Sequence, residues 1–249
     1  MVDENNIIAI IQARIGSTRL PGKALMNIEG KPMLWHVINR IKCSKYINKI
    51  IIATTTNKKD DQIENFCKKY DIEFYRGMEE DVLDRYYQAA KLWKANIIVR
   101  ICSDNPLIDP QIIDKVIACY LENKDILNGA STNINLTYPL GLNTEVISFS
   151  TLERVWKEAK KDYQREHVTI YIYENANNFK ISSVENEKNL SHFHWTVDED
   201  KDLKFIREIY KILYKKKNIF LMKDILNLLE RKPYLTEINK NVVRKEIKK

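Results

Sequence analysis

Residues 7–25 read IIAIIQARIGSTRLPGKAL and indicate the fold of the amino-terminal half. Residues 7–11 are apolar and mostly β-branched, which is typical of a strand buried on both faces. The residues that follow carry two glycines and three cations, Arg14, Arg19 and Lys23. A helix is expected from Pro32, because proline suits the first helical turn. A strand, a basic loop and a helix in this order are typical of anion sites in α/β proteins.

The loop suits a polyphosphate but matches none of the common phosphate motifs. Gly16 and Gly22 let the backbone approach an anion, and no acidic residue lies between Asn5 and Ile28. A P-loop requires G-x-x-x-x-G-K-[ST]. Here five residues separate the glycines, and alanine follows Lys23. The loop alone therefore leaves two interpretations open, a phosphate site and a solvated basic loop.

The composition indicates a globular protein with a packed core. The chain has 249 residues, of which 44% are hydrophobic and 30% charged. No apolar run reaches the ~20 residues that a membrane span needs. Because the first residues are polar and acidic, unlike a signal peptide, we expect a cytoplasmic protein without membrane contact. The four cysteines form no CxxC pair, which argues against a zinc site or a disulfide framework.

The net charge of +7 is concentrated at the carboxyl end of the chain. Residues 201–249 hold 15 Lys or Arg against 6 Asp or Glu, whereas residues 1–200 hold 26 against 28. A solvated helix face and a lysine tail account for this distribution as well as RNA binding does. Nucleic acid is therefore not the expected partner.

Strands and helices alternate through the first half of the chain. The alternation predicts βαβ units and a mostly parallel sheet with right-handed crossovers. We expect strands at residues 7–11, 50–54, 72–75 and 97–101, and helices at residues 32–42, 60–69, 81–93 and 110–121.

The alternation breaks at residues 130–148, where turn residues separate short strand-like pieces. We interpret this segment as a small antiparallel excursion or a dimerisation arm. Residues 1–231 are predicted to form a single domain, followed by a basic carboxyl-terminal tail at residues 232–249. Beyond the excursion we expect helices at residues 151–160, 165–174, 201–214 and 219–230, and strands at residues 179–184 and 193–197.

Two aspartates lie where ligands bind in an open α/β sheet, beyond the carboxyl ends of strands. Asp104 follows the strand at residues 97–101, and Asp198 follows the one expected at residues 193–197. Two carboxylates brought together there form an oxygen site suited to Mg²⁺, which takes only one or two protein carboxylates when phosphates complete its shell. We interpret three further acids as caps or flanks of helix starts, namely Asp109, Asp200 and Asp202.

Five segments together resemble the cytidylyltransferase family that includes the CMP-sialate and CMP-Kdo synthetases. The first, residues 12–23, is long and specific, and the others follow with suitable order and spacing: residues 81–86, 104–110, 165–169 and 196–198. The resemblance spans roughly residues 7–215 and is greatest to the SpsF-like branch of spore coat polysaccharide proteins.

This resemblance implies a three-layer α/β/α nucleotidyltransferase fold, Rossmann-like and GT-A-like. It also implies Mg²⁺-dependent transfer of CMP from CTP to a sugar, a sugar acid, or a small phosphate or phosphonate acceptor. Pyrophosphate would leave, and the product would serve surface polysaccharide or glycoconjugate precursor synthesis. A homodimer is the expected assembly.

The resemblance also implies roles for individual residues. The catalytic residues are Arg14, Lys23 and Asp104, and the metal ligands are Asp104 and Asp198. The nucleotide would contact Ala13, Arg14, Gly16, Ser17, Arg19, Lys23, Thr54, Thr55 and Ser103. The acceptor would contact Arg76, Arg100, Glu145, Arg165 and His167, of which His167 suits a helix-terminal structural role equally well.

The chain departs from the family at two places. It reads Ser103-Asp104-Asn105-Pro106 where the family has Gly-Asp-Cys-Pro, and residues 139–145 lack two acids of the pattern Pro-Asp-Gly-Leu-Asp-Val-Glu. We interpret both departures as signs of an altered acceptor, because the phosphate and metal residues are intact.

Two other function classes stay open. One is a glycosyltransferase on a related fold, which would use Asp198-Glu199-Asp200 as a DxD metal motif and release a nucleoside diphosphate. The other is a non-catalytic module that binds nucleotide or RNA through the basic tail. Neither the acceptor nor the preference for cytosine over another base follows from the sequence.

Overall fold

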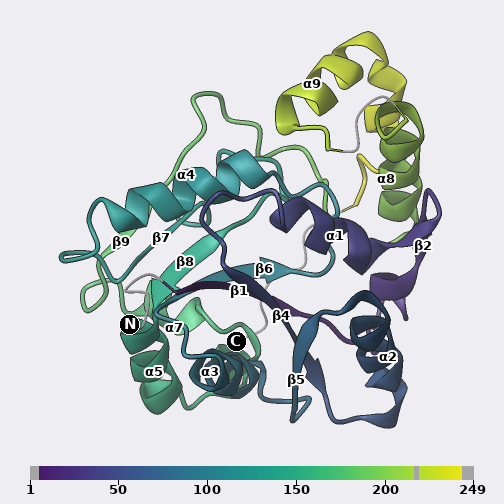
Figure 1. The fold of residues 1–249 in the computed structure, drawn as a ribbon. Coiled ribbons are helices and arrows are strands. Elements are labelled where there is room, and N and C mark those ends of the chain that lie inside the picture. The colour runs from purple at the N-terminus through teal and green to yellow at the C-terminus, as the bar shows by residue number, and fades with distance from the viewer. Residues whose placement is uncertain (1–5, 216–218, 243–249) are drawn as a thin grey trace.

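The computed structural model describes residues 6–215 and 219–242. Within these residues a seven-stranded sheet has the order β5-β4-β1-β6-β8-β7-β9 (Figure 1). The first four of these strands are parallel, β8 is antiparallel to both β6 and β7, and β9 is parallel to β7. The strands are β1 (Ile7–Gln12), β4 (Lys49–Thr55), β5 (Glu73–Gly77), β6 (Ile97–Cys102), β7 (Gly129–Ser131), β8 (Glu145–Ser148) and β9 (Ile181–Ser183). This confirms the mostly parallel sheet with a small antiparallel excursion.

Helices cover both faces of this sheet, so the fold has the expected three layers (Figure 1). Ile7, Ala9 and Ile11 of β1 pack on one face, and Ile8 and Ile10 on the other. Both faces of β1 are therefore buried, as the apolar run predicts. The first face contacts α1 (Met33–Ile41), α2 (Asp61–Tyr70) and α4 (Pro110–Leu121), and the second contacts α3 (Val82–Leu92), α5 (Phe149–Glu158) and α7 (Ile170–Glu174).

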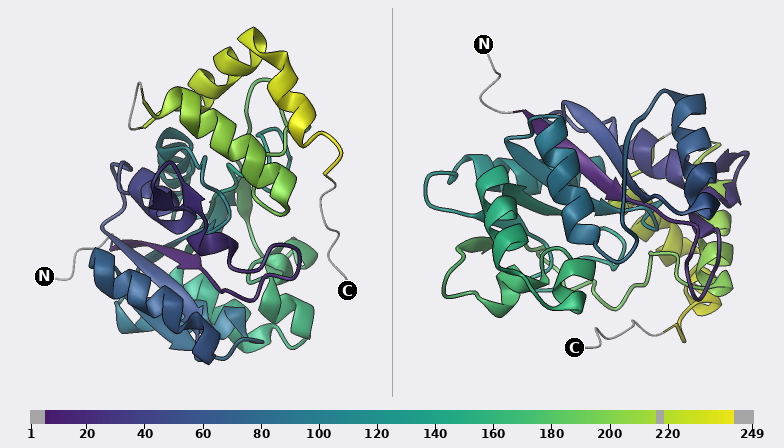
Figure 2. Two further views of the ribbon diagram at one scale, coloured as in Figure 1. Left: turned by 90° about the vertical axis from the view of Figure 1, so that its right-hand side faces the viewer. Right: turned by 90° about the horizontal axis from the view of Figure 1, so that it is seen from below.

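A third apolar cluster belongs to the carboxyl-terminal helices α8 (Asp200–Leu213) and α9 (Met222–Arg231), which lie beside α1 (Figures 1 and 2). His36 of α1 packs edge-on against Tyr210 of α8. The short antiparallel ribbon of β2 (Asn27–Ile28) and β3 (Lys31–Pro32), which the sequence did not predict, precedes α1.

The sequence predictions at residues 165–174 and 193–197 are wrong. Two short helices, α6 (Asp162–Glu166) and α7, replace the first, because Val168 between them has a left-handed backbone with φ of 53°. Residues 193–197 form no strand, and pairing is limited to one bridge between Leu140 and His194. Their alternation reflects the burial of Trp195 and Val197 in a loop.

The described part of the predicted tail is packed against the protein. Pro233–Ile238 forms a 3-10 helix, and its Leu235 is fully buried in the cluster of α8 and α9. Asn239, the next residue, is 5% exposed. The prediction of a tail that starts at residue 232 is therefore wrong as far as residue 239, and residues 243–249 lie outside the described part of the chain.

Over residues 6–215 and 219–242, the helices are too short or too polar to span a lipid bilayer.

Candidate active site

Parallel pairing places the carboxyl ends of β1, β4, β5 and β6 at one edge of the sheet. Gln12, the last residue of β1, pairs with Ala53 of β4 and Cys102 of β6. The basic loop, the loop of Asp104 and the loop before α3 all start there. Ligands of open α/β sheets bind at this edge, so the candidate site has the expected location.

The basic loop is a closed turn. The Gly22 N–H donates to the Ile15 carbonyl oxygen at 2.9 Å, and the Ile15 N–H donates to Oδ1 of Asp60 at 2.6 Å. Gly22 has φ of 75°, a left-handed conformation that glycine adopts without a steric penalty, and Lys23 follows it in a short 3-10 helix. The turn thus fixes the point from which the Lys23 side chain departs.

Two acids that the sequence did not single out support this loop. Asp60 also accepts a hydrogen bond from the Thr55 hydroxyl. Glu79 pairs with Nη1 of Arg14 at 3.0 Å and lies 3.6 Å from Nζ of Lys59. A Cβ on Gly16 would lie 2.7 Å from that same ammonium, so a larger residue there would require the flexible Lys59 side chain to shift. Both acids follow strand ends, which is the signal that could have identified them.

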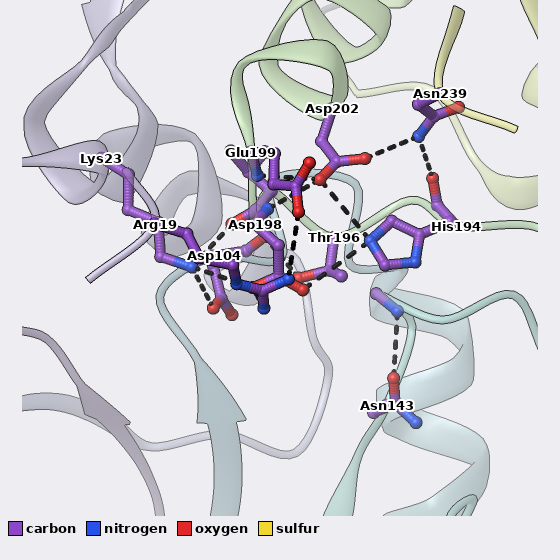
Figure 3. A network of polar contacts seen from close by, with 12 residues as sticks. Arg19, Lys23, Asp104, Asn143, His194, Thr196, Asp198, Glu199, Asp202 and Asn239 are labelled. Carbon is purple, nitrogen blue, oxygen red and sulfur yellow. Dashed lines mark hydrogen bonds and ion pairs between the residues drawn. The ribbon is translucent and has the colours of Figure 1, made fainter. Parts of the chain in front are cut away.

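Lys23 brings the two candidate metal ligands together (Figure 3). Its Nζ lies 2.7 Å from Oδ2 of Asp104 and 3.4 Å from Oδ1 of Asp198, and it donates to the Val197 carbonyl oxygen at 2.6 Å. Burial alone would lower the pKa of the Lys23 ammonium, but Asp104 and Asp198 raise it above its ordinary value. The ammonium is therefore charged at neutral pH.

The turn that carries Asp198 is joined to the loop of Asp104 and to the basic loop. The Val197 N–H donates to the Asp104 carbonyl oxygen at 2.9 Å. Arg19 pairs with Oδ1 of Asp198 at 2.8 Å and with Glu199 at 3.6 Å. Two cations of one loop thus contact carboxylates that are 94 residues apart in the sequence, Asp104 and Asp198.

These groups line a cleft of about 200 Å³. Nine of the residues predicted for the site are in its lining: Ala13, Arg14, Ser17, Arg19, Lys23, Ser103, Asp104, His167 and Asp198. The prediction missed six others, namely Gln12, Thr18, Val82, Arg85, Cys102 and Glu166. Val82 and Arg85 belong to residues 81–86, which carried the family resemblance without an assigned role, so that segment was the available signal.

The other predicted residues, all in the described part of the chain, lie outside this lining. Thr54 and Thr55 are fully buried, and Gly16 lies beneath Lys59. Arg76 donates to the Thr55 and Asn57 carbonyl oxygens and pairs with Asp61 and Glu64 of α2. Arg165 pairs with Asp81 at 2.7 Å and donates to the carbonyl oxygens of Trp156 and Ala159. The geometry gives these arginines structural partners.

Arg100 and Glu145 form an ion pair between neighbouring strands β6 and β8. Glu145 also accepts hydrogen bonds from the hydroxyl groups of Thr169, at 2.8 Å, and Tyr173. Burial would raise the pKa of Glu145, but Arg100 and these hydroxyl groups lower it. The Glu145 side chain is 3% exposed, so the structure does not bring it to the cleft.

Asp104 and Asp198 suit a hard divalent cation, because two carboxylates from separate loops already face one positive charge. Within the described residues no third His, Cys, Asp or Glu completes a metal cluster. Two protein carboxylates match Mg²⁺ when a polyphosphate supplies further oxygens. The donor set therefore fits Mg²⁺ bound together with a nucleotide.

Comparison with known proteins identifies the family. Residues 8–246 match the family model described as cytidylyltransferase. The chain is 30% identical to the spore coat polysaccharide biosynthesis protein SpsF of Bacillus subtilis, over 92% of this chain and 96% of that protein. It is 38% identical to the 3-deoxy-manno-octulosonate cytidylyltransferase of Geobacter sulfurreducens, over 50% of this chain and 49% of that protein.

A solved structure agrees with these matches. The cytidylyltransferase of Leptospira borgpetersenii superposes with a TM-score of 0.90 at 29% identity, covering 97% of this chain and all of that one. The family match extends through nearly the whole chain and includes every residue of the cleft. The chain belongs to the cytidylyltransferase family and is a CTP-dependent nucleotidyltransferase.

Proposed function

We propose that the cleft transfers CMP from CTP to an oxygen of a sugar acid and releases pyrophosphate, with Mg²⁺ held by Asp104 and Asp198. The observation that carries the proposal is the convergence of both carboxylates on Lys23 at 2.7 and 3.4 Å. A cation from the basic loop and two metal ligands thus meet at one point of the cleft. A nucleotide polyphosphate is the ligand that requires both kinds of group.

The chain's own residues would act mainly by positioning and by charge neutralisation. Arg14, Arg19 and Lys23 exchange their carboxylate partners for phosphate oxygens when CTP binds. The acceptor oxygen forms a bond to the α-phosphorus, while the bond from that phosphorus to the pyrophosphate oxygen breaks. Lys23 neutralises charge on the leaving pyrophosphate. Bound Mg²⁺ would supply further stabilisation of charge on the phosphate oxygens.

A sugar acid is the acceptor class that the relatives favour, since one of them is a 3-deoxy-manno-octulosonate cytidylyltransferase. The two acids missing from residues 139–145 bear on this choice. Leu140 and Asn143, which replace them, line a separate cavity of about 160 Å³ with His194. The substitutions therefore leave the lining of the nucleotide cleft unchanged.

The glycosyltransferase alternative has little support from the geometry. Of Asp198-Glu199-Asp200, only Asp198 lines the cleft, and Asp200 starts α8. The two functions also differ in their products, because a glycosyltransferase releases a nucleoside diphosphate.

The proposal is tested by incubating the protein with Mg²⁺, each of the four nucleoside triphosphates and a panel of sugar acids. Detection of pyrophosphate and of a CMP conjugate in equal amounts, only with CTP and one acceptor class, is the expected result. Release of a nucleoside diphosphate, or equal turnover of all four nucleotides, would contradict it.

We also propose a homodimer that uses the excursion at residues 130–148. Ile134 and Leu136 of this segment are 39% and 38% exposed, which is consistent with a covering partner. Light scattering of the wild type and of the Ile134→Lys variant would test this assembly.

A further inference from the structure

Asp202 holds the backbone of the turn that carries Asp198. It is fully buried, and its Oδ2 accepts hydrogen bonds from the backbone N–H groups of Asp198, at 3.0 Å, and Glu199, at 2.9 Å. The other carboxylate oxygen, Oδ1, accepts a hydrogen bond from Nδ2 of Asn239 at 2.9 Å (Figure 3). Both oxygens of Asp202 are therefore in use, and the second one depends on the carboxyl-terminal segment.

Asn239 contacts both ends of this turn. Its Nδ2 also donates to the His194 carbonyl oxygen at 2.8 Å. One buried amide group thus bridges His194, four residues before Asp198, and Asp202, four residues after it. Leu235, fully buried in the cluster of α8 and α9, anchors the preceding 3-10 helix. Asn239 therefore holds the loop that carries Asp198, one of the two candidate metal ligands.

The contacts of Asn239 are most important when CTP occupies the cleft. Two cations hold the Asp198 side chain, Arg19 at 2.8 Å and Lys23 at 3.4 Å, and Nε2 of His194 lies 3.7 Å from its Oδ2. If those cations move to phosphate oxygens, as the proposed function requires, Asp198 keeps the contact of its Oδ2 with Nε2 of His194 and its backbone support from Asp202. Asn239 holds both supports, because its amide binds the His194 carbonyl oxygen as well as Asp202. Groups that orient a metal ligand in this way commonly change metal affinity when they are lost.

We propose that Asn239 is a positioning residue for the divalent cation, acting through Asp202 on Asp198. This proposal rests on the proposed function, in which Asp198 binds Mg²⁺. It assigns the carboxyl-terminal segment a part in metal binding, although Asn239 is not in the lining of the cleft. A purely structural Asn239 would lower stability and would affect binding with and without metal alike.

The Asn239→Ala variant tests this role, with Asn241→Ala as the matched control on an exposed position of the same segment. The CTP dissociation constant is measured by calorimetry once in EDTA and once in excess Mg²⁺. The ratio of the two constants is the gain in CTP affinity that the metal gives. Thermal unfolding of each variant is recorded in parallel.

We expect Asn239→Ala to reduce the metal gain roughly tenfold, the lower end of the range for supporting residues of metal sites. CTP affinity in EDTA should stay within about twofold of the wild type. Asn241→Ala should match the wild type in both conditions. Should Asn239→Ala fold poorly, Asn239→Ser keeps one donor for one of the two acceptors and should show a smaller reduction.

An unchanged metal gain in a folded Asn239→Ala or Asn239→Ser protein would overturn the role of Asn239 and leave the proposed function intact. A wild-type protein with no metal gain at all would overturn both. An equal loss of affinity in EDTA and in Mg²⁺ would identify Asn239 as a structural residue only.

Discussion

Lys23 and Arg100 both pair with carboxylates from distant parts of the chain, but the two clusters differ in access. Lys23, Asp104 and Asp198 form the open cluster, with side chains 13%, 25% and 19% exposed along a cleft. Arg100 and Glu145 form the sealed cluster, in which Glu145 is 3% exposed and also binds two hydroxyl groups. A ligand can replace the partners in the first cluster, whereas in the second the protein itself satisfies Glu145.

A basic residue near the end of a strand can therefore either bind a ligand or stabilise the fold. The deciding property is whether its partner carboxylate faces a cavity. The acids that pair with Arg76 and Arg165, namely Asp61, Glu64 and Asp81, also lie outside the lining of the cleft. The family resemblance alone could not make this distinction, because it compares residue types and not their surroundings.

The largest expected effect is on stability, in the sealed cluster. Glu145→Ala leaves Arg100, whose side chain is 13% exposed, without its charge partner, which should lower the free energy of unfolding by about 3–5 kcal/mol. Urea unfolding measures the change. Lys157→Ala, at the exposed partner of an ion pair on α5, is the control and should change stability by under about 0.5 kcal/mol.

A Glu145→Ala protein of normal stability with a selectively raised KM for the acceptor would contradict the structural role of Glu145. It would show instead that Glu145 contacts the acceptor.

The second effect is on catalysis, in the open cluster. Lys23→Ala should lower kcat/KM for CTP by about 10²–10³-fold, the scale seen when one group that stabilises transition-state charge is removed. Its thermal midpoint should stay close to that of the wild type. Steady-state pyrophosphate release measures the rate, and Lys49→Ala, a half-exposed lysine on β4, is the control. Full activity in a folded Lys23→Ala protein would show that Lys23 has no role in catalysis.

A smaller effect concerns the pH dependence of stability. Because the pKa of Glu145 in the folded protein lies below its ordinary value of 4.5, its contribution is present above that pH and is lost as the pH falls. Glu145→Gln should therefore lose less stability than the wild type on acidification below pH 4.5. The expected difference is at most about 1.4 kcal/mol per pH unit for one proton. Urea unfolding at a series of acidic pH values measures both slopes, and identical slopes would contradict the assignment.

The smallest effect belongs to the terminal charges, which are part of neither cluster. A chain that ends at Val242 lacks four of the Lys and Arg residues at the carboxyl end but keeps Leu235 and Asn239. Its CTP affinity should stay within about twofold of the wild type. Loss of CTP binding in this truncation, measured by calorimetry, would favour the alternative of binding through the basic tail.

Local sequence pattern predicted the parallel half of the sheet because burial there is uniform. Strands β1, β4 and β6 are apolar on both faces, and in an α/β chain an apolar run of that kind is typical of a central parallel strand. The pattern failed where a tertiary contact decides the backbone. At residues 165–174, Val168 is buried and Thr169 binds Glu145, so the chain turns where periodicity alone favours one helix.

The sequence predicted the charged residues of the candidate site but not the residues that hold them in place. The spacing of Arg14, Arg19 and Lys23 and the position of Asp104 after a strand identified the cleft. The supporting groups are the amide of Asn239 and the carboxylates of Asp60 and Glu79, which act through hydrogen bonds and ion pairs between separate segments of the chain. The strand ends before Asp60 and Glu79 were the available signal for these two acids, whereas no periodicity or local motif marks the contacts of Asn239 with His194 and Asp202.

The central claim is that Asp104 and Asp198 share one divalent cation beside the triphosphate. Replacing Mg²⁺ by Fe²⁺ and adding ascorbate generates short-lived radicals that cut the backbone next to the bound metal, and mass spectrometry locates the cuts. We expect cuts near both Asp104 and Asp198, which appear only when CTP is present and disappear with excess Mg²⁺. Cuts at only one of these aspartates, or at a different part of the chain, would contradict it.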